Sequence, residues 1–250
     1  MIVLLPPSES KTGRRRGRPV DPDALSFPEL AETRRRVAVA LRQVSLSPEA
    51  PALLGVSPNL LDDIARNLVL DSAPATPAAE VYTGVLYDAL DLAGLDPGAR
   101  RRAARRLLVV SALYGAVRPT DRIAPYRLAM GVSLPGLGPL ATLWRPVLAD
   151  ALPAAAGSGV VVDCRSAAYA AAWPAPRSLA QRWVQVRVPG ASHFAKHTRG
   201  LVARRLCLEP SAPRSVPDVA AVLGRSFAVV LHEPAGAGRP WVLDVAAPPR

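Results

Sequence analysis

Six short apolar runs along the chain predict β-strands. Three of them, at 2–5, 107–110 and 160–162, consist entirely of aliphatic residues, which is typical of strands buried on both faces of a sheet. The run at 182–188 instead alternates apolar and polar residues, which is the period of a half-buried strand. The six runs are residues 2–5, 107–110, 160–162, 182–188, 227–231 and 241–245.

Segments with helical spacing lie between these runs. Residues 28–44 place Leu30, Val37, Leu41 and Val44 seven, four and three residues apart, so these side chains share one helix face. A second helix is predicted to begin at Asp96-Pro97, and a third covers residues 140–152. The pattern predicts a single α+β domain over residues 1–250, with a central mixed β-sheet surrounded by helices.

Residues 111–131 follow a buried strand but lack the pattern of a long helix or strand. Two prolines interrupt them, and each lacks an N–H and restrains the residue before it, so we expect an ordered loop. The loop carries Arg118, Arg122, Arg127, Tyr114 and Tyr126. One interpretation is that the guanidinium groups bind phosphate or carboxylate while the rings stack on a ligand. The alternative is a loop packed by its tyrosines, with the arginines in solvent.

Polar side chains also gather where other predicted strands end. The loop after the first strand brings hydroxyl groups, a carboxylate and an amine into residues 8–12, although it lacks the glycine spacing of a P-loop. Because α/β proteins place ligand sites at strand ends, we predict a pocket assembled from several such loops. Its candidate residues are Ser8, Lys11, Tyr82, Thr83, Tyr114, Asp163, Lys196 and Arg199.

Five sequence blocks, taken in order, resemble the bacterial YaaA family of peroxide stress proteins. The most specific is Leu-Tyr-Gly-x-x-Arg-Pro-x-Asp-x-x-x-Pro-Tyr-Arg-Leu-x-Met-Gly at 113–131. The other four are residues 4–12, 81–84, 160–169 and 195–201. The resemblance implies a cytoplasmic protein that binds DNA and helps to limit free intracellular iron and oxidative DNA damage.

Residues 48–68 resemble a helix-hairpin-helix element, which binds the DNA backbone through a tight turn between two helices. The usual turn is Gly, an apolar residue, Gly; here it is Gly55, Val56 and Ser57, and the serine puts the closest backbone approach in doubt. The alternative is an ordinary turn between two helices. The expected DNA-binding residues in this element and in the central loop are Gly55, Ser57, Asn59, Arg66, Arg118, Arg122 and Arg127.

Composition supports a polyanionic partner. The chain has 31 basic and 20 acidic residues and a formal net charge of +11, which favours DNA, duplex or branched, over an acidic small molecule. Arginine, alanine and proline are all abundant, and GC-rich coding alone is the alternative, less favoured explanation of the charge. The two cysteines, Cys164 and Cys207, are expected to be reduced thiols of a cytoplasmic protein. No apolar stretch approaches the length of a membrane span, so we expect no membrane partner.

Two other chemistries compete with DNA binding. The three histidines, His193, His197 and His232, could join a carboxylate in a metal site. The family pattern requires none of them, so we assign neither a metal site nor a cofactor. The second is an enzyme that acts on a nucleotide, a nucleobase or another small anion. Its pocket would be lined by Lys11, Tyr82, Arg118, Arg127 and Lys196. Asp163 would serve as base, and Lys11 or Lys196 as acid or nucleophile. Nothing in the spacing identifies a reaction, and the catalytic residues stay unassigned.

Overall fold

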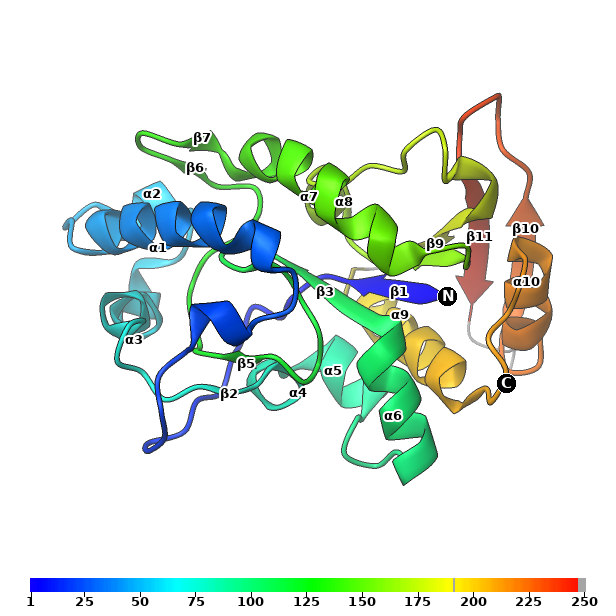
Figure 1. Cartoon of the computed structure of the whole chain (residues 1–250), viewed down its shortest axis with the longest axis horizontal. Helices are drawn as coiled ribbons and strands as arrows, with labels where there is room; N and C mark the ends of the chain where they lie inside the picture. The colour runs from blue at the N-terminus through cyan, green and yellow to red at the C-terminus, as the bar shows by residue number, and fades with distance from the viewer. Residues whose placement is uncertain (191, 247–250) are drawn as a thin grey trace.

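The computed structural model of the protein describes residues 1–190 and 192–246. Its centre is a mixed seven-stranded sheet, in the order β10-β11-β9-β8-β1-β3-β4 (Figure 1). Five strands are parallel, and β4 and β10 form antiparallel edges. The strands are β1 (Ile2–Leu5), β3 (Leu107–Ser111), β4 (Gly115–Val117), β8 (Val161–Asp163), β9 (Trp183–Arg187), β10 (Ala228–His232) and β11 (Trp241–Ala246).

The six predicted strands are all confirmed. In the three central strands every residue is buried, which explains their continuous apolar sequence. The β9 strand shows the predicted alternation, with Gln185 and Arg187 exposed. The edge strand β10 is only partly covered. The predicted α+β class with a mixed central sheet is therefore confirmed.

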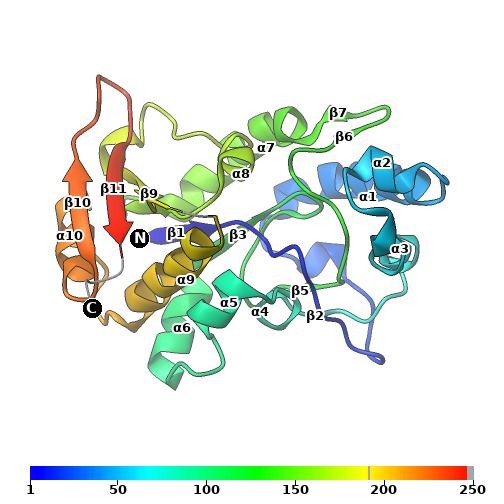
Figure 2. The same cartoon turned by 180° about the vertical axis from the view of Figure 1, so that it is seen from behind.

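Helices cover both faces of the sheet. The views from front and back both place α7 (Leu140–Ala156) on one side of β1 and β3, and α5 (Val85–Leu90), α6 (Pro97–Arg106) and α9 (Ser192–Leu208) on the other (Figure 2). A second group lies beyond one end of the sheet: α1 (Ala31–Ser45), α2 (Ala50–Leu54) and α3 (Leu61–Ala65). The remaining α-helices are α4 (Ala78–Val81), α8 (Ala167–Ala170) and α10 (Val216–Gly224).

Short elements complete the described chain. The 3-10 helices are η1 (Pro22–Ala24), η2 (Pro28–Leu30), η3 (Pro58–Leu60), η4 (Arg66–Val69) and η5 (Ala180–Arg182). Two small antiparallel pairs join β2 (Thr76–Pro77) to β5 (Arg122–Ile123) and β6 (Ser133–Leu134) to β7 (Gly138–Pro139). One continuous cluster of buried apolar side chains extends from Ile2 to Val245 and includes residues of the sheet and of both helix groups.

The central loop at 111–131 is more regular than predicted, because it contains β4 and β5. Tyr114 and Tyr126 are both buried, and their rings meet edge to face with centroids 5.5 Å apart. Of the two interpretations, the loop packed by its tyrosines describes these rings, which are too buried to stack on a ligand. Gly115 explains the Tyr-Gly pair of the motif: its φ is +70°, and a Cβ there would lie 2.5 Å from the Trp144 ring.

Candidate functional site

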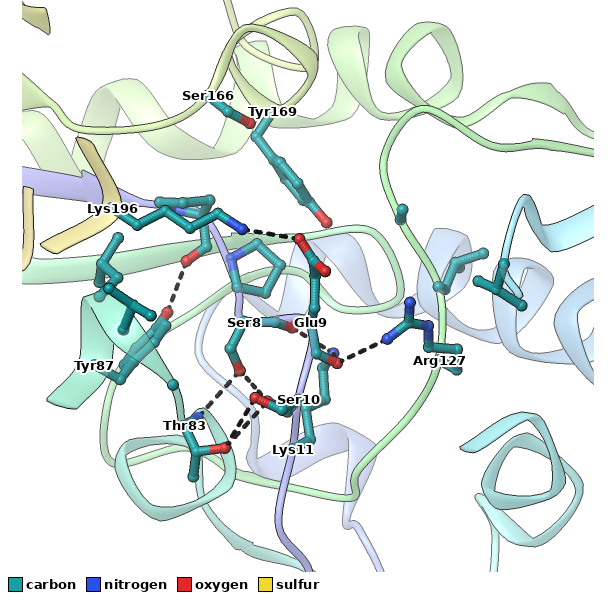
Figure 3. Close-up of a pocket in the computed structure, with 18 of the residues that line it drawn as sticks. Ser8, Glu9, Ser10, Lys11, Thr83, Tyr87, Arg127, Ser166, Tyr169 and Lys196 are labelled. Atoms are coloured by element: carbon teal, nitrogen blue, oxygen red, sulfur yellow. Dashed lines mark hydrogen bonds and ion pairs between the residues drawn. The ribbon is translucent and has the colours of Figure 1, made fainter. Parts of the chain in front are cut away.

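A cavity of about 480 Å³ opens at the carboxyl ends of β1 and β8 (Figure 3). The chain runs from β1 to β3 on one side and later returns to β8 on the other, so the order of strands changes direction at β1. Open α/β sheets bind ligands in the crevice that such a change creates. The residues that follow the two strands, Pro6 to Lys11 after β1 and Ser166 after β8, line the cavity.

The loop after β1 is held in place by the Val-Tyr-Thr-Gly block. The backbone of Lys11 bridges that of Tyr82, and the Thr12 N–H donates to the Val81 carbonyl at 2.9 Å. The Thr83 N–H donates to the Ser8 hydroxyl oxygen at 3.1 Å, and the Thr83 hydroxyl donates to the Ser10 carbonyl at 3.3 Å. Two sequence blocks that lie far apart in the chain thus form one wall of the cavity.

Lys11 is a buried amine in this wall. Its Nζ donates to the Ser8 carbonyl at 2.6 Å and lies 4.4 Å from the centre of the Tyr126 ring. Its side chain and backbone together are only 6% exposed. Burial, and secondarily the positive charge of Arg127, lowers the pKa of Lys11 to about 7. The amine is therefore substantially neutral at physiological pH, unlike an ordinary lysine.

Arg127 enters the cavity from the central loop. Its N–H donates to Asn67 Oδ1 at 2.8 Å, and its Nη1 donates to the Glu9 carbonyl at 3.3 Å. The Asp63 carboxylate lies 4.0 Å from the guanidinium group. Arg66 is drawn inward as well, because its Nη1 donates to the Lys11 carbonyl at 2.6 Å. The segment α3–η4 is thereby attached to the loop after β1.

Helix α9 supplies two more cations from the Ala-Lys-His-Thr-Arg-Gly-Leu block. Lys196 Nζ pairs with Glu9 at 3.0 Å, which lowers the pKa of that carboxyl group (Figure 3). Arg199 also lines the cavity, and its buried Nε has no hydrogen-bond partner among the described residues. The lining therefore contains four basic side chains, Lys11, Arg127, Lys196 and Arg199, against the single carboxylate of Glu9.

The predicted helix-hairpin-helix segment opens onto the same cavity. Leu54, Gly55 and Val56 line it, and Gly55 adopts the left-handed conformation, with φ 63° and ψ 39°, that ends α2. The N–H groups of Gly55 and Val56 are used inside the turn. Ser57 caps η3, since its hydroxyl oxygen accepts from the Asn59 N–H at 3.3 Å. Of the three turn N–H groups, only that of Ser57 makes no hydrogen bond within the described chain. The turn therefore offers fewer free donors than we expected.

The structure brings together most of the predicted pocket. Ser8, Lys11, Thr83, Lys196 and Arg199 line the cavity, and Tyr82 lies buried behind Lys11. Tyr82 itself is not a lining residue, and two other predicted residues lie away from the cavity.

Tyr114 packs in the core, where its hydroxyl group donates to the Ala124 carbonyl at 3.2 Å. Asp163 forms a buried ion pair with Arg165, whose Nη2 lies 2.7 Å from the carboxylate. Neither side chain is therefore available to a ligand in the cavity.

The seven predicted DNA-binding residues fall into separate places. Gly55 and Arg127 line the cavity, while Ser57 and Asn59 are exposed just beyond its hairpin edge. Arg118 lies at the opposite end of the sheet, since its Nη1 donates to the Arg105 carbonyl just before β3 begins. Arg122 lies on β5 and donates to the Ala75 carbonyl. Arg118 lies in the loop between β4 and β5, whereas Arg127 follows β5. Arg66, the seventh residue, donates to the Lys11 carbonyl beside the cavity.

Sequence reasoning missed several lining residues. Ser166 and Tyr169 face the cavity from the loop and short helix after β8, and Tyr87 donates its hydroxyl proton to the Pro6 carbonyl at 2.8 Å. Burial raises the pKa of Tyr169 to about 12, so its hydroxyl stays protonated. The 160–169 block contains Ser166 and Tyr169, and Tyr87 follows the 81–84 block, but nothing in the local pattern showed which way these side chains would point.

No metal-binding arrangement is found in the described part of the chain, where no three His, Cys, Asp or Glu side chains gather. The side chain of His193 lies outside the described residues. His197 lines a second cavity, between α9 and the start of β10, and His232 pairs with Asp244. Both cysteines are buried and free. Among the described residues, no helix has the length and apolar character needed to cross a membrane.

A family model described as peroxide stress protein YaaA matches residues 1–220. The chain belongs to the YaaA family. A UPF0246 protein of Streptomyces coelicolor is 49% identical over 254 residues, which is 98% of each chain. One from Corynebacterium efficiens is 38% identical over 93% of this chain and 96% of its own, and one from Roseobacter denitrificans is 32% identical over 82% and 84%.

Membership of the YaaA family gives the five motif blocks a common structural role. Four of them, at 4–12, 81–84, 160–169 and 195–201, supply lining residues from different elements of this fold. The fifth, at 113–131, supplies Arg127 and buries its tyrosines beneath Lys11. The family motifs therefore converge on the cavity.

Proposed function

We propose that this YaaA-family protein binds DNA, duplex or branched, through the phosphate backbone and without strong sequence preference. The observation that carries the proposal is the meeting of the Gly55 hairpin and three basic side chains, Arg127, Lys196 and Arg199, around one cavity. Phosphate contacts of this kind orient a protein on DNA but read no bases. The helices on either side of the hairpin, α2 and α3, have five residues each, so neither is long enough to read bases from a major groove.

Electrostatics supports a polyanionic partner. The net charge is +11, and the cavity lining is predominantly cationic. The Nε of Arg199 is buried and has no hydrogen-bond partner among the described residues, and Ser57 is exposed next to the lining residue Val56. Binding that neutralises about four phosphates gives a slope of roughly −3.6 in a plot of log affinity against log salt concentration. The proposed interface therefore predicts a strongly salt-dependent affinity.

The test is fluorescence anisotropy on labelled duplexes of unrelated sequence across a salt series. Arg127→Ala should weaken binding to every duplex alike and make the salt slope shallower by about one. Arg118→Ala is the matched control, because it removes the same charge from the opposite end of the sheet. Salt-independent binding, or equal losses in the two variants, would count against the proposed interface.

The family name implies a role in peroxide stress, and DNA binding offers a physical route to that role. We propose that occupancy of DNA limits oxidative damage to it, and that any effect on free intracellular iron is indirect. Strand breakage by iron and peroxide in the presence of the protein should then fall in proportion to the DNA bound. Protection that persists when high salt has released the DNA would contradict this route.

A second candidate function is an enzyme acting on a nucleotide or a related small anion. It is favoured by Lys11, whose lowered pKa of about 7 and position in a cavity wall are typical of a reactive amine. A thermal-shift screen of nucleotides and nucleosides, on wild type and Arg127→Ala, tests it. A ligand at 100 times its Kd stabilises the fold by about 2.7 kcal/mol. If no compound in the screen raises the Tm and DNA binding is intact, the enzyme proposal is refuted and the DNA-binding proposal remains.

A further inference from the structure

The amine of Lys11 is not explained by DNA binding. A phosphate contact is best made by a fully charged, solvent-facing group, whereas this amine is buried, held by the Ser8 carbonyl at 2.6 Å and placed over the Tyr126 ring. Tyr126 is fixed in turn, since its hydroxyl group lies 2.7 Å from that of Ser111. A desolvated lysine held rigidly in a cavity wall is the arrangement that makes an amine nucleophilic toward a carbonyl carbon.

The rest of the cavity specifies what carries that carbonyl group. Arg127 and Arg199 line the same space, and the buried Nε of Arg199 lacks a partner among the described residues. Guanidinium groups of this kind suit a phosphate. The ligand therefore combines a phosphate with an electrophilic carbon.

The wall between these groups fits a sugar better than a base. Hydroxyl groups of Ser8, Thr83, Ser166 and Tyr169 come from lining residues. Tyr82 and Tyr126 are 2% exposed each and cannot present their faces to a nucleobase, and the Tyr87 ring is stacked on that of Tyr82. Among the described lining residues, this leaves Tyr169 as the one ring that could stack on a base. A sugar phosphate whose base is missing satisfies this lining.

We infer that Lys11 forms a covalent imine with the C1 aldehyde of a 2-deoxyribose phosphate whose phosphate group is held by Arg127 and Arg199. The neutral amine adds to the aldehyde carbon, a C–N bond forms, and the carbonyl oxygen leaves as water with the two amine protons. No oxidant or reductant is consumed. The aldehyde comes either from an abasic site in DNA or from a free sugar phosphate. The first source rests on the proposed DNA binding, and the second does not. An abasic nucleotide leaves the stack at little cost, since it has no base to unpair.

The charges around Lys11 determine how this reaction depends on pH. Arg127 and Arg66 favour the neutral amine, while Asp63 and Glu9 favour the ammonium form. With burial they give a pKa of about 7. The rate of imine formation at Lys11 should therefore reach its plateau near pH 8, whereas the free amino acid lysine continues to gain reactivity toward its pKa of about 10.4.

The experiment is reductive trapping with borohydride, in two arms. One arm uses a duplex with a single abasic site, and the other uses free 2-deoxyribose 5-phosphate. Peptide mass spectrometry then locates the reduced adduct. Lys196 and the Met1 amino group are internal controls, because they are the other amines of the chain. Lys11→Arg, which keeps the charge but cannot form the imine, should lower the adduct yield at least about tenfold.

An adduct at Lys11 in the duplex arm supports the inference with DNA as the source, and one only in the free-sugar arm supports it with a small sugar phosphate. An adduct at Lys196 or Met1 with Lys11 unmodified overturns it. Binding of the intact duplex is measured separately by anisotropy. Intact binding without an adduct in either arm overturns the covalent step and leaves the DNA proposal standing. Loss of duplex binding refutes that proposal, and the free-sugar arm still decides the inference.

Discussion

Gly200 sits where α9 crosses α5, and replacing it with alanine tests how the cavity is held together. A Cβ at this position would lie 2.8 Å from the Ala89 Cβ and closer still to the Leu86 carbonyl oxygen. Carbon atoms in contact are separated by about 3.5–4.0 Å, so the helices would have to separate by about 1 Å. Helix α9 carries Lys196 and Arg199 into the cavity, and the displacement would move both.

The size of the effect follows from two opposing contributions. Overpacking of a well-packed interface costs about 1–3 kcal/mol, and a clash with backbone belongs at the upper end of that range. Alanine offsets about 1 kcal/mol of this through its better helix propensity. The free energy of unfolding should therefore fall by about 2 kcal/mol, which for a chain of this length lowers Tm by about 4–8 °C.

Urea unfolding and calorimetry measure this change, and DNA anisotropy measures its consequence for the site. Gly131→Ala is the matched control, because no atom lies within 4 Å of the Cβ position there. Equal stability of Gly200→Ala and wild type would refute the reasoning. So would an equal loss in Gly131→Ala, which would show that the cost is not specific to the helix crossing.

Three further predictions concern groups outside the cavity. Asp163→Asn should lower the free energy of unfolding by about 3–5 kcal/mol, because Arg165, whose side chain is 0% exposed, is left charged without a partner. The same change at Asp244 should cost under about 1 kcal/mol, because its partner Arg187 is 60% exposed, and urea titrations compare the two. Arg187 and secondarily His232 hold the pKa of Asp244 at about 2, so the stabilisation is present above about pH 4 and is lost as pH falls through 2. An NMR carboxyl titration should show this pKa rising in Arg187→Ala, and an unchanged value would contradict the assignment. Burial raises the pKa of Cys164 to about 12, so this thiol should resist alkylation in the folded protein at neutral pH and react after unfolding; rapid native labelling would argue against its burial.

Local pattern predicted the strands because burial on both faces leaves a direct trace in the sequence. The runs at 2–5, 107–110 and 160–162 are continuous because these strands lie in the middle of the sheet. The edge strand β4 escaped prediction, since Gly115–Val117 has no such length. Its pairing with β3 depends on a turn that is possible only because Gly115 accepts a positive φ beneath Trp144.

The site was predictable as a set of loops but not residue by residue. Lys11, Thr83, Lys196 and Arg199 were recognised from their blocks, and parallel strands bring such blocks to one edge. Asp163 has the same kind of position after a strand, yet its neighbour Arg165 folds back and neutralises it. The two outcomes differ only in side-chain direction, which local sequence does not encode.

The sequence by itself determined the family, six of the seven strands of the central sheet and the excess of positive charge, because these depend on residue identity and short-range pattern. Tertiary structure alone decided which end of the sheet each arginine of the central loop occupies: Arg118 follows the antiparallel β4 back to the amino end of β3, while Arg127 returns to the cavity. It also decided that Lys11 is buried. Desolvation depends on every chain segment packed around the amine. These segments include the nearby Ser8 but also Arg66 and Tyr126, which are far away in the sequence.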